Sequence, residues 1–110
     1  MIVAVTGGRD FNDIERVRRA LYQLEPCPTL LIHGGAVGAD TLAAQVAEEL
    51  GIRTEAFAAD WENHKRKAGP IRNAAMVARK PDLLLAFPGH RGTANMTRQA
   101  IAAGIPVRQV

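Results

Sequence analysis

The chain has 110 residues, of which 47% are hydrophobic and 23% are charged, and its formal net charge is +3 at pH 7. This length fits one domain over residues 1–110, with a core large enough for the chain to fold without disulfides or bound metal ions. No apolar run is long enough for a membrane span or a signal peptide, and one cysteine, Cys27, excludes a disulfide framework and a cysteine metal cluster. We therefore expect a cytoplasmic globular protein without a metal site or a membrane partner.

The N-terminal segment predicts a buried strand followed by an amphipathic helix. Residues 1–5 form an apolar, β-branched run that is typical of a central parallel strand. Asn12 and Glu15 have the spacing of a capping box, and apolar residues then fall on one helical face until Pro26. We expect Asn12 to cap this helix.

A second strand and helix follow, and then the longest connection in the chain. Residues 29–32 predict another buried strand, and the helix after them is expected to end at Gly51, where a left-handed residue is favoured. Residues 53–58 alternate partly, as a strand near a sheet edge does. Residues 59–69 show no clear period, so we expect a polar loop, which in compact domains is often functional.

The C-terminal part of the chain repeats the alternation. A buried strand, a helix and an edge strand are expected at residues 83–87, 93–103 and 105–110. Strands that alternate with helices imply an α/β fold of three layers, because right-handed crossovers place helices on both faces of a parallel sheet. Ligands bind such sheets beyond the carboxyl ends of the strands, where the winding direction reverses.

Two of the expected helices are rich in alanine. Pro70 suits the first turn of one, which carries the apolar stripe Ile71, Ala74, Ala75 and Ala78, and the last helix carries Ala100 and Ala103. Small residues allow helices to pack closely, so these faces favour a homo-oligomer. The alternative is that the same alanines lie beneath the sheet.

Three glycine-rich turns follow three of the strands and predict a common binding edge. They contain Gly7 and Gly8, then Gly34, Gly35 and Gly38, and finally Gly89 and Gly92. We expect Gly89 and Gly92 to take positive φ and Thr93 to cap the next helix, whose other first N–H groups would face an anion. The cations available to pair with phosphates are Arg9, Arg72 and Arg91. Neither a dinucleotide-binding fingerprint nor a P-loop is complete.

Catalytic residues are less clearly indicated than a phosphate site. The candidate acids near the turns are Asp10, Asp40, Asp60 and Glu62. Asp40 is placed either to contact a hydroxyl or ribose or only to complement a helix dipole, and His33 is expected to be a satisfied histidine at a strand end. Trp61 either stacks on a base or closes the sheet edge. With the basic charge balance, it also leaves nucleic-acid binding open.

Five segments, taken in order, resemble the YspA-type, YpsA-related branch of the SLOG superfamily: residues 5–11, 33–40, 59–61, 69–73 and 87–96. The resemblance implies a Rossmann-like three-layer sandwich with a mostly parallel five-stranded sheet. It also implies a small-molecule nucleotide ligand of the NAD or ADP-ribose kind. The candidate ligand-binding residues are Thr6, Gly7, Gly8, Arg9, Gly34, Gly35, Gly38, Asp40, Arg72, Asn73, Pro88, Gly89, Arg91, Gly92 and Thr93.

The same superfamily contains the Lonely Guy phosphoribohydrolases and DNA-processing protein A, which binds single-stranded DNA. Arg72 matches the arginine of the Lonely Guy catalytic pair, but the glutamate position falls on Asn95, and His90 replaces a loop glycine. An amide cannot supply the negative charge that stabilises an oxocarbenium ion. We therefore expect a binding module. The alternatives are a nucleotide N-glycosidase that uses Arg72, Asp40 or Asp60, and a binder of single-stranded nucleic acid.

Overall fold

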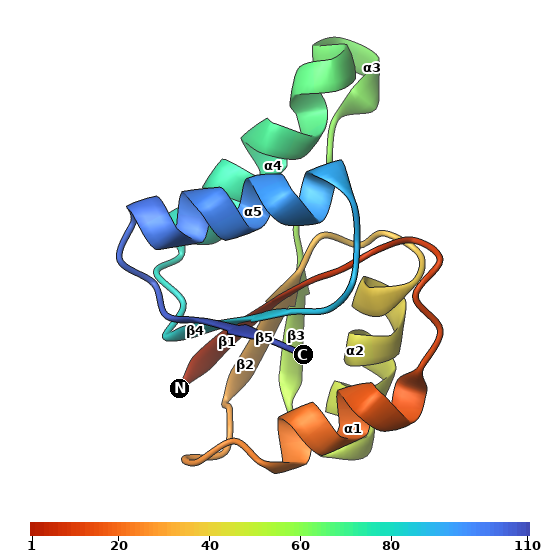
Figure 1. The fold of residues 1–110 in the computed structure, drawn as a ribbon, viewed down its shortest axis with the longest axis vertical. Helices are drawn as coiled ribbons and strands as arrows, with labels where there is room; N and C mark the ends of the chain where they lie inside the picture. The colour runs from red at the N-terminus through yellow and green to blue at the C-terminus, as the bar shows by residue number, and fades with distance from the viewer.

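Five strands alternate with helices along the chain in the computed structural model, which describes residues 1–110 (Figure 1). The strands are β1 (Ile2–Thr6), β2 (Leu30–His33), β3 (Arg53–Ala56), β4 (Leu83–Ala86) and β5 (Val107–Gln109). The helices are α1 (Ile14–Tyr22), α2 (Ala39–Glu49), α3 (Trp61–His64), α4 (Ala68–Ala78) and α5 (Arg91–Ala102), and a 3-10 turn over Lys65–Lys67 joins α3 to α4. None of these helices has both the length and the apolar composition needed to cross a membrane.

The five strands form one sheet in the order β3-β2-β1-β4-β5. All four pairings are parallel, and the central residue Ala4 lies opposite Ile32 on one side and Leu84 on the other. The prediction of a Rossmann-like sheet is confirmed, with every strand parallel. Because the chain reverses its winding direction between β1 and β4, the crevice where such sheets bind ligands lies beyond the ends of these two strands.

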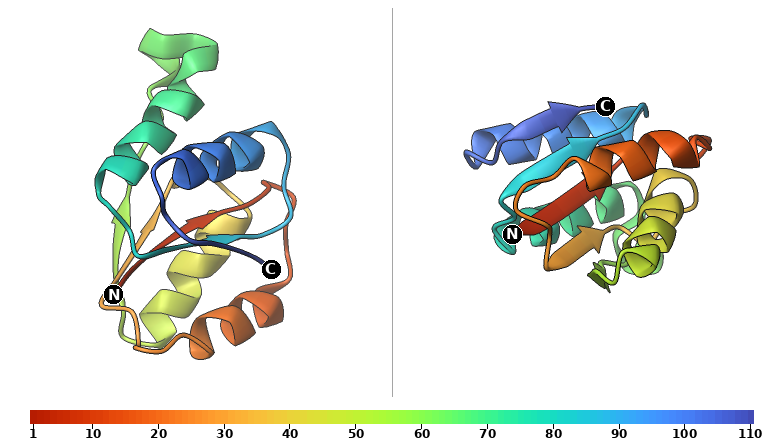
Figure 2. Two further views of the ribbon diagram at one scale, coloured as in Figure 1. Left: turned by 60° about the vertical axis from the view of Figure 1, so that its left-hand side comes forward. Right: turned by 90° about the horizontal axis from the view of Figure 1, so that it is seen from below.

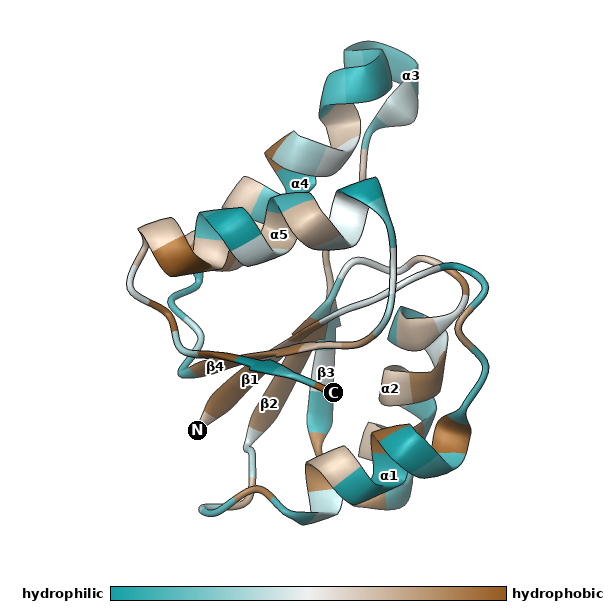
Figure 3. Cartoon of the chain, in the orientation of Figure 1, coloured by the Kyte–Doolittle hydropathy of each residue, from teal (hydrophilic) through white to brown (hydrophobic).

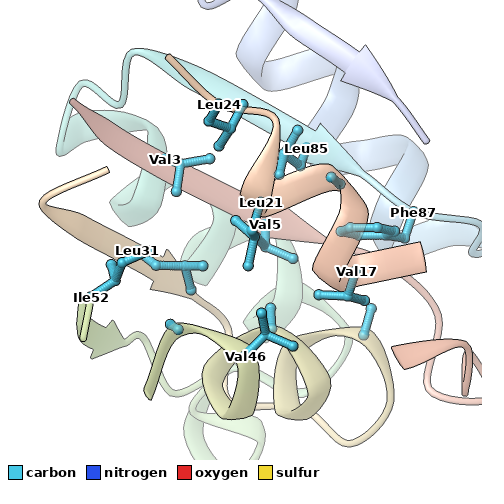
Figure 4. Packing of buried hydrophobic residues seen from close by; sticks show 14 of the residues in the cluster. Val3, Val5, Val17, Leu21, Leu24, Leu31, Val46, Ile52, Leu85 and Phe87 are labelled. Carbon is cyan, nitrogen blue, oxygen red and sulfur yellow. The ribbon is translucent and has the colours of Figure 1, made fainter. Parts of the chain in front are cut away.

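Helices cover both faces of the sheet, so the sheet divides the hydrophobic core into two clusters (Figures 1 and 2). On one face Val3 and Val5 of β1 belong to a cluster with Val17 of α1 and residues of α2 (Figure 4). On the other face Ala4 joins a smaller cluster that includes Met96 of α5. Successive strand residues point to opposite faces, and both faces are covered, so the inner strands appear in the sequence as continuous apolar runs.

The start of α1 corrects the predicted cap. The N-cap is Asp13, whose Oδ1 accepts a hydrogen bond from the Arg16 N–H at 3.1 Å. The predicted cap, Asn12, lies one residue too early, since Glu15 pairs with Arg18 instead of reaching back toward Asn12. Either side chain type can cap a helix, so the pattern alone does not separate the two positions.

The predicted loop over residues 59–69 is mostly helical. Asp60 caps the short helix α3, accepting from the Asn63 N–H at 3.2 Å and from its side-chain amide at 2.8 Å. Lys65 then takes a φ of 51° where the chain turns toward α4. This segment projects from the body of the molecule and is hydrophilic along its outer part (Figures 1 and 3). A helix that buries no side chain has no apolar period, which explains why the sequence pattern does not show it.

The apolar stripe of α4 faces outward instead of toward the sheet. Ile71 is 45% exposed, and the three alanines of the stripe, Ala74, Ala75 and Ala78, are exposed as well. The buried face of α4 is made by other residues, including Asn73 and Met76. The placement of these alanines beneath the sheet is therefore wrong for α4, although Ala100 of α5 is buried.

Candidate functional site

The three glycine-rich turns meet at the carboxyl edge of the sheet. Gly8, which follows β1, contacts both of the others: its N–H donates to the Pro88 carbonyl at 2.8 Å, and its carbonyl accepts from the Ala39 N–H at 3.2 Å. A Cβ on Gly38 would collide with the Gly8 carbonyl, and a Cβ on Gly89 would lie 2.8 Å from the Gly8 nitrogen. Close backbone packing therefore requires glycine at both positions.

The left-handed glycines lie in a different turn from the one predicted. Gly35 and Gly38, between β2 and α2, have φ of 73° and 88°, whereas Gly89 and Gly92 do not have positive φ. Gly89 is restricted by its neighbours, and an added Cβ on Gly92 would meet open space. The prediction of positive φ at residues 89 and 92 is thus wrong.

A cleft of about 790 Å³ opens beside these turns, bounded by the end of β1 and by residues of α2, α3, α4 and α5. Its charged lining consists of five arginines and two aspartates, namely Arg9, Arg66, Arg72, Arg91, Arg98, Asp10 and Asp40. The volume lies in the range of small-molecule sites, about 300–1,000 Å³. The excess of guanidinium groups favours an anionic ligand that can accept paired hydrogen bonds.

Helix α5 presents an uncapped N-terminus to this cleft. The helix begins at Arg91, and His90 at the N-cap makes no side-chain capping bond. The N–H groups of Arg91, Gly92 and Thr93 donate to no other protein group, and the first helical bond runs from Ala94 to the His90 carbonyl at 3.0 Å. The prediction that Thr93 caps this helix is therefore wrong, because Thr93 lies inside its first turn. Free N–H groups at the positive end of a helix dipole form an anion site.

Arg72 and Asp40 hold the turn between β2 and α2 from two sides. Arg72 Nη1 donates to the Gly34 carbonyl at 2.7 Å, while Asp40 Oδ2 accepts from the N–H groups of Gly34 at 3.1 Å and Ala36 at 3.3 Å. A Cβ on Gly34 would collide with the Arg72 guanidinium. Asp40 is only 6% exposed, and its Oδ1 has no hydrogen-bond partner. The wall of the cleft thus contains one carboxylate oxygen without a partner.

Burial shifts the pKa of three groups beside this turn. The pKa of Asp40 is raised because burial penalises the carboxylate, and this outweighs the hydrogen bond from Ala36 and the nearby charges. Burial likewise lowers the pKa of His33, whose Nδ1 accepts from the Gly35 N–H at 3.0 Å, so His33 is the satisfied histidine predicted. Burial also lowers the pKa of Arg72, which still remains a cation at neutral pH.

The position that matches the Lonely Guy glutamate belongs to a chain of amides. Asn95 Oδ1 accepts from Asn73 Nδ2 at 3.0 Å and from Gln99 Nε2 at 2.8 Å. Asn73, which is 3% exposed, also donates to the Gly92 carbonyl at 3.3 Å and accepts from Arg72 Nε at 2.9 Å. Asn73 therefore links Arg72 to the start of α5 and fixes the orientation of its guanidinium.

Most of the predicted binding residues line the cleft: Thr6, Gly7, Gly8, Arg9, Asp40, Arg72, Arg91, Gly92 and Thr93. Gly34 and Gly35 line an adjoining hollow of about 330 Å³, as do Arg9 and Arg72. The remaining four line neither space: Gly38, Pro88 and Gly89 belong to the turns, and Asn73 lies in α4, where it bonds to Arg72. Asp60, which the N-glycosidase alternative offers beside Asp40, lies outside both spaces and serves as the cap of α3.

Several lining residues were not singled out by the sequence analysis. Arg98 is the clearest case, because it follows Arg91 by seven residues and so lies on the same face of α5 two turns later. That spacing is a signal that the sequence contains. Gly69 and Pro70 were not predicted to bind the ligand, and they reach the cleft from the first turn of α4, where Pro70 was expected.

Sequence comparison gives relatives along nearly the whole chain. Residues 1–64 match the family described as the YspA, cpYpsA-related SLOG family. The chain is also 41% identical over 115 residues to the Gene 61 protein of Mycobacterium phage D29, a match that covers 96% of this chain and 92% of that protein.

Solved structures of the same fold are similar at low identity. DNA processing protein A (DprA) from Streptococcus pneumoniae has a TM-score of 0.75 and 20% identity over 97% of this chain, which spans about half, 49%, of that protein. The structural-genomics target TM1055 has a TM-score of 0.73 and 22% identity over 96% of this chain and 71% of that one. These likenesses concern the fold, whereas the sequence matches identify the group: the chain belongs to the YspA, cpYpsA-related SLOG family.

Proposed function

We propose that this protein binds a phosphate-bearing nucleotide or a nucleotide-derived ligand, of the NAD or ADP-ribose kind, in the cleft. The observation that carries the proposal is the uncapped N-terminus of α5, where the N–H groups of Arg91, Gly92 and Thr93 have no protein partner. Helix starts of this kind bind phosphate groups. The cleft also lies at the switch point between β1 and β4, where open α/β sheets bind ligands.

Arg72 supports the proposal from another wall of the cleft. Its Nε and Nη1 donate to Asn73 and Gly34, which fixes the plane of the guanidinium, while Nη2 donates to no protein group. An arginine whose orientation is set in this way offers its free N–H groups to a ligand with little loss of side-chain entropy. We therefore expect Arg72 to contact the ligand through Nη2.

Hydrolysis of an N-glycosidic bond is the second candidate, and the Asp40 carboxyl is the observation that favours it. Asp40 is the buried acid of the cleft and has a raised pKa, a combination common at catalytic sites. Against it, Asn95 is an amide bonded to Asn73 and Gln99 and cannot carry charge. Turnover predicts free base when concentrated protein is incubated with a nucleoside monophosphate or NAD. Chromatography that detects no base leaves binding as the function.

A thermal-shift screen tests binding directly. The panel contains nucleoside mono-, di- and triphosphates, NAD and ADP-ribose, and the proteins are the wild type, Arg91→Ala and the control Arg108→Ala. Arg91 lines the cleft, and Arg108 is another exposed arginine, which lies outside the cleft on β5. A ligand at about 100 times its Kd adds about 2.7 kcal/mol of stability, a shift of many degrees for this size.

The expected result is a shift with at least one nucleotide that is reduced in Arg91→Ala and retained in Arg108→Ala. A flat response of the folded wild type across the panel contradicts the proposal. If single-stranded nucleic acid binds instead, with an affinity that falls steeply as salt rises, the nucleic-acid alternative replaces it.

A further inference from the structure

The hollow beside the cleft differs from it in chemistry. We call it the alanine pocket, since its lining includes Ala36, Ala56, Ala58 and Ala59, together with Gly34 and Gly35. It contains no acidic residue, and its volume is about 330 Å³. It shares four lining residues with the cleft, two of which are Trp61 and Arg72, so the two spaces adjoin.

Trp61 stands where the alanine pocket meets the cleft. Its side chain lines both spaces and is 49% exposed, which leaves much of the indole surface uncovered. The guanidinium carbon of Arg9 lies 6.0 Å from the ring centroid, at the outer limit of a cation–π contact. A half-exposed indole beside two hollows is suited to stacking on a flat ligand group.

The lining of the alanine pocket also includes two residues whose backbone N–H groups have no protein partner. The backbone N–H groups of Ala58 and Ala59, which follow β3, donate to no other protein group. Nucleobases carry ring nitrogens and carbonyl oxygens that accept such bonds. Small side chains around free N–H groups and one exposed indole are the features expected of a base subsite.

We infer that the alanine pocket holds the flat base of the ligand against Trp61, while the phosphates lie in the cleft at the start of α5. The inference rests on the proposed function and extends it, since it names a ligand in which a base and a phosphate are joined by a sugar. Arg72 lines both spaces and lies where the sugar would cross between them. The base would also compete with Arg9 for the indole face and free that guanidinium for the phosphates.

The test compares ligands with and without a base. The probes are ADP and inorganic pyrophosphate, titrated calorimetrically into the wild type, Trp61→Ala, Trp61→Phe and Ala56→Leu. Ala56 is exposed at the end of the edge strand β3, and a Cβ on Gly35 would lie 4.0 Å from its Cβ, so a larger side chain fills the alanine pocket without disturbing the core. The chain has one tryptophan, so tryptophan fluorescence reports on Trp61 alone.

We expect Trp61→Ala and Ala56→Leu to weaken ADP binding about tenfold or more, while pyrophosphate affinity changes less than about twofold. Trp61→Phe retains an aromatic face and should lose less affinity than Trp61→Ala. ADP should quench the fluorescence of Trp61 more than pyrophosphate does. Unchanged ADP affinity in both Trp61→Ala and Ala56→Leu, or an equal loss for pyrophosphate, overturns the inference but leaves the proposed function standing. A wild type that binds neither probe nor any nucleotide overturns both.

Discussion

Arg72 and Asp40 hold the same residue from opposite ends. Arg72 Nη1 lies 2.7 Å from the carbonyl oxygen of Gly34, and Asp40 Oδ2 lies 3.1 Å from the Gly34 nitrogen. One residue comes from α4 and the other from α2, so the turn after β2 is fixed by helices on both faces of the sheet. Two of the charged groups that line the cleft therefore also shape its wall.

This double role predicts that Arg72→Ala lowers both stability and ligand affinity. The substitution leaves the Gly34 carbonyl without its partner and removes the free Nη2, so we expect the free energy of unfolding to fall by about 1–3 kcal/mol. The matched control is Arg79→Ala at the end of the same helix, since Arg79 is exposed and pairs with Glu55 at the surface. Urea denaturation measures the free energy of unfolding of both variants. A control that loses as much stability as Arg72→Ala contradicts this role.

Asp40 predicts a dependence of stability on pH. Burial raises its pKa in the folded state above the usual 3.8, which applies to the unfolded chain. At a pH between the unfolded-state pKa and the folded-state pKa, the folded state therefore binds more protons than the unfolded state. Its contribution to the free energy of unfolding therefore falls as the pH rises through that window. Asp40→Asn removes the titration and leaves an oxygen to accept from Gly34 and Ala36.

The free energy of unfolding of Asp40→Asn minus that of the wild type should thus increase from about pH 4 toward neutrality. Taking the difference cancels the titration of the other carboxylates. Denaturant titrations at a series of pH values give this difference directly. A constant or decreasing difference would show that the carboxylate is better solvated, or better paired, than the structure describes.

We predict that substitution by alanine has opposite effects on stability at Gly89 and at Gly92. A Cβ on Gly89 would meet the Thr93 side chain and the Gly8 nitrogen, so Gly89→Ala should cost about 1–3 kcal/mol as the turns move apart. Gly92 lies in the first turn of α5 with open space around it, so Gly92→Ala should stabilise by about 0.5–1 kcal/mol. Thermal unfolding of the two variants checks the sign. Equal effects would be inconsistent with the packing of these turns.

Much of the fold follows from local sequence patterns. The strands appear as short apolar runs because parallel strands buried on both faces select apolar residues at every position. The ends of two helices are equally direct, since Gly51 and Gly104 take the left-handed φ that glycine allows at little cost. These features depend on neighbouring residues only, so the sequence suffices to predict them.

The rest depends on contacts between segments that are distant in the sequence. The start of α5 at Arg91 has no cap to mark it, because its free N–H groups face the cleft instead of a side chain. The stripe at Ile71 shows a helical period but not which side of α4 meets the sheet, and Asn73 is buried there because it bonds to Asn95 and Gly92. Glycines constrained by close contact, such as Gly89, look the same in a sequence as glycines of positive φ.

The most direct test of the proposed site is a titration of ¹⁵N-labelled protein with ADP, followed by the backbone amide resonances. The N–H groups of Arg91, Gly92 and Thr93 lack protein partners, so a phosphate at the start of α5 must change their environment. We predict that these three amides shift the most and saturate together, while the amides of α1 remain unchanged. If ADP binds and the three amides do not move, the phosphates lie elsewhere and this account of the cleft is wrong.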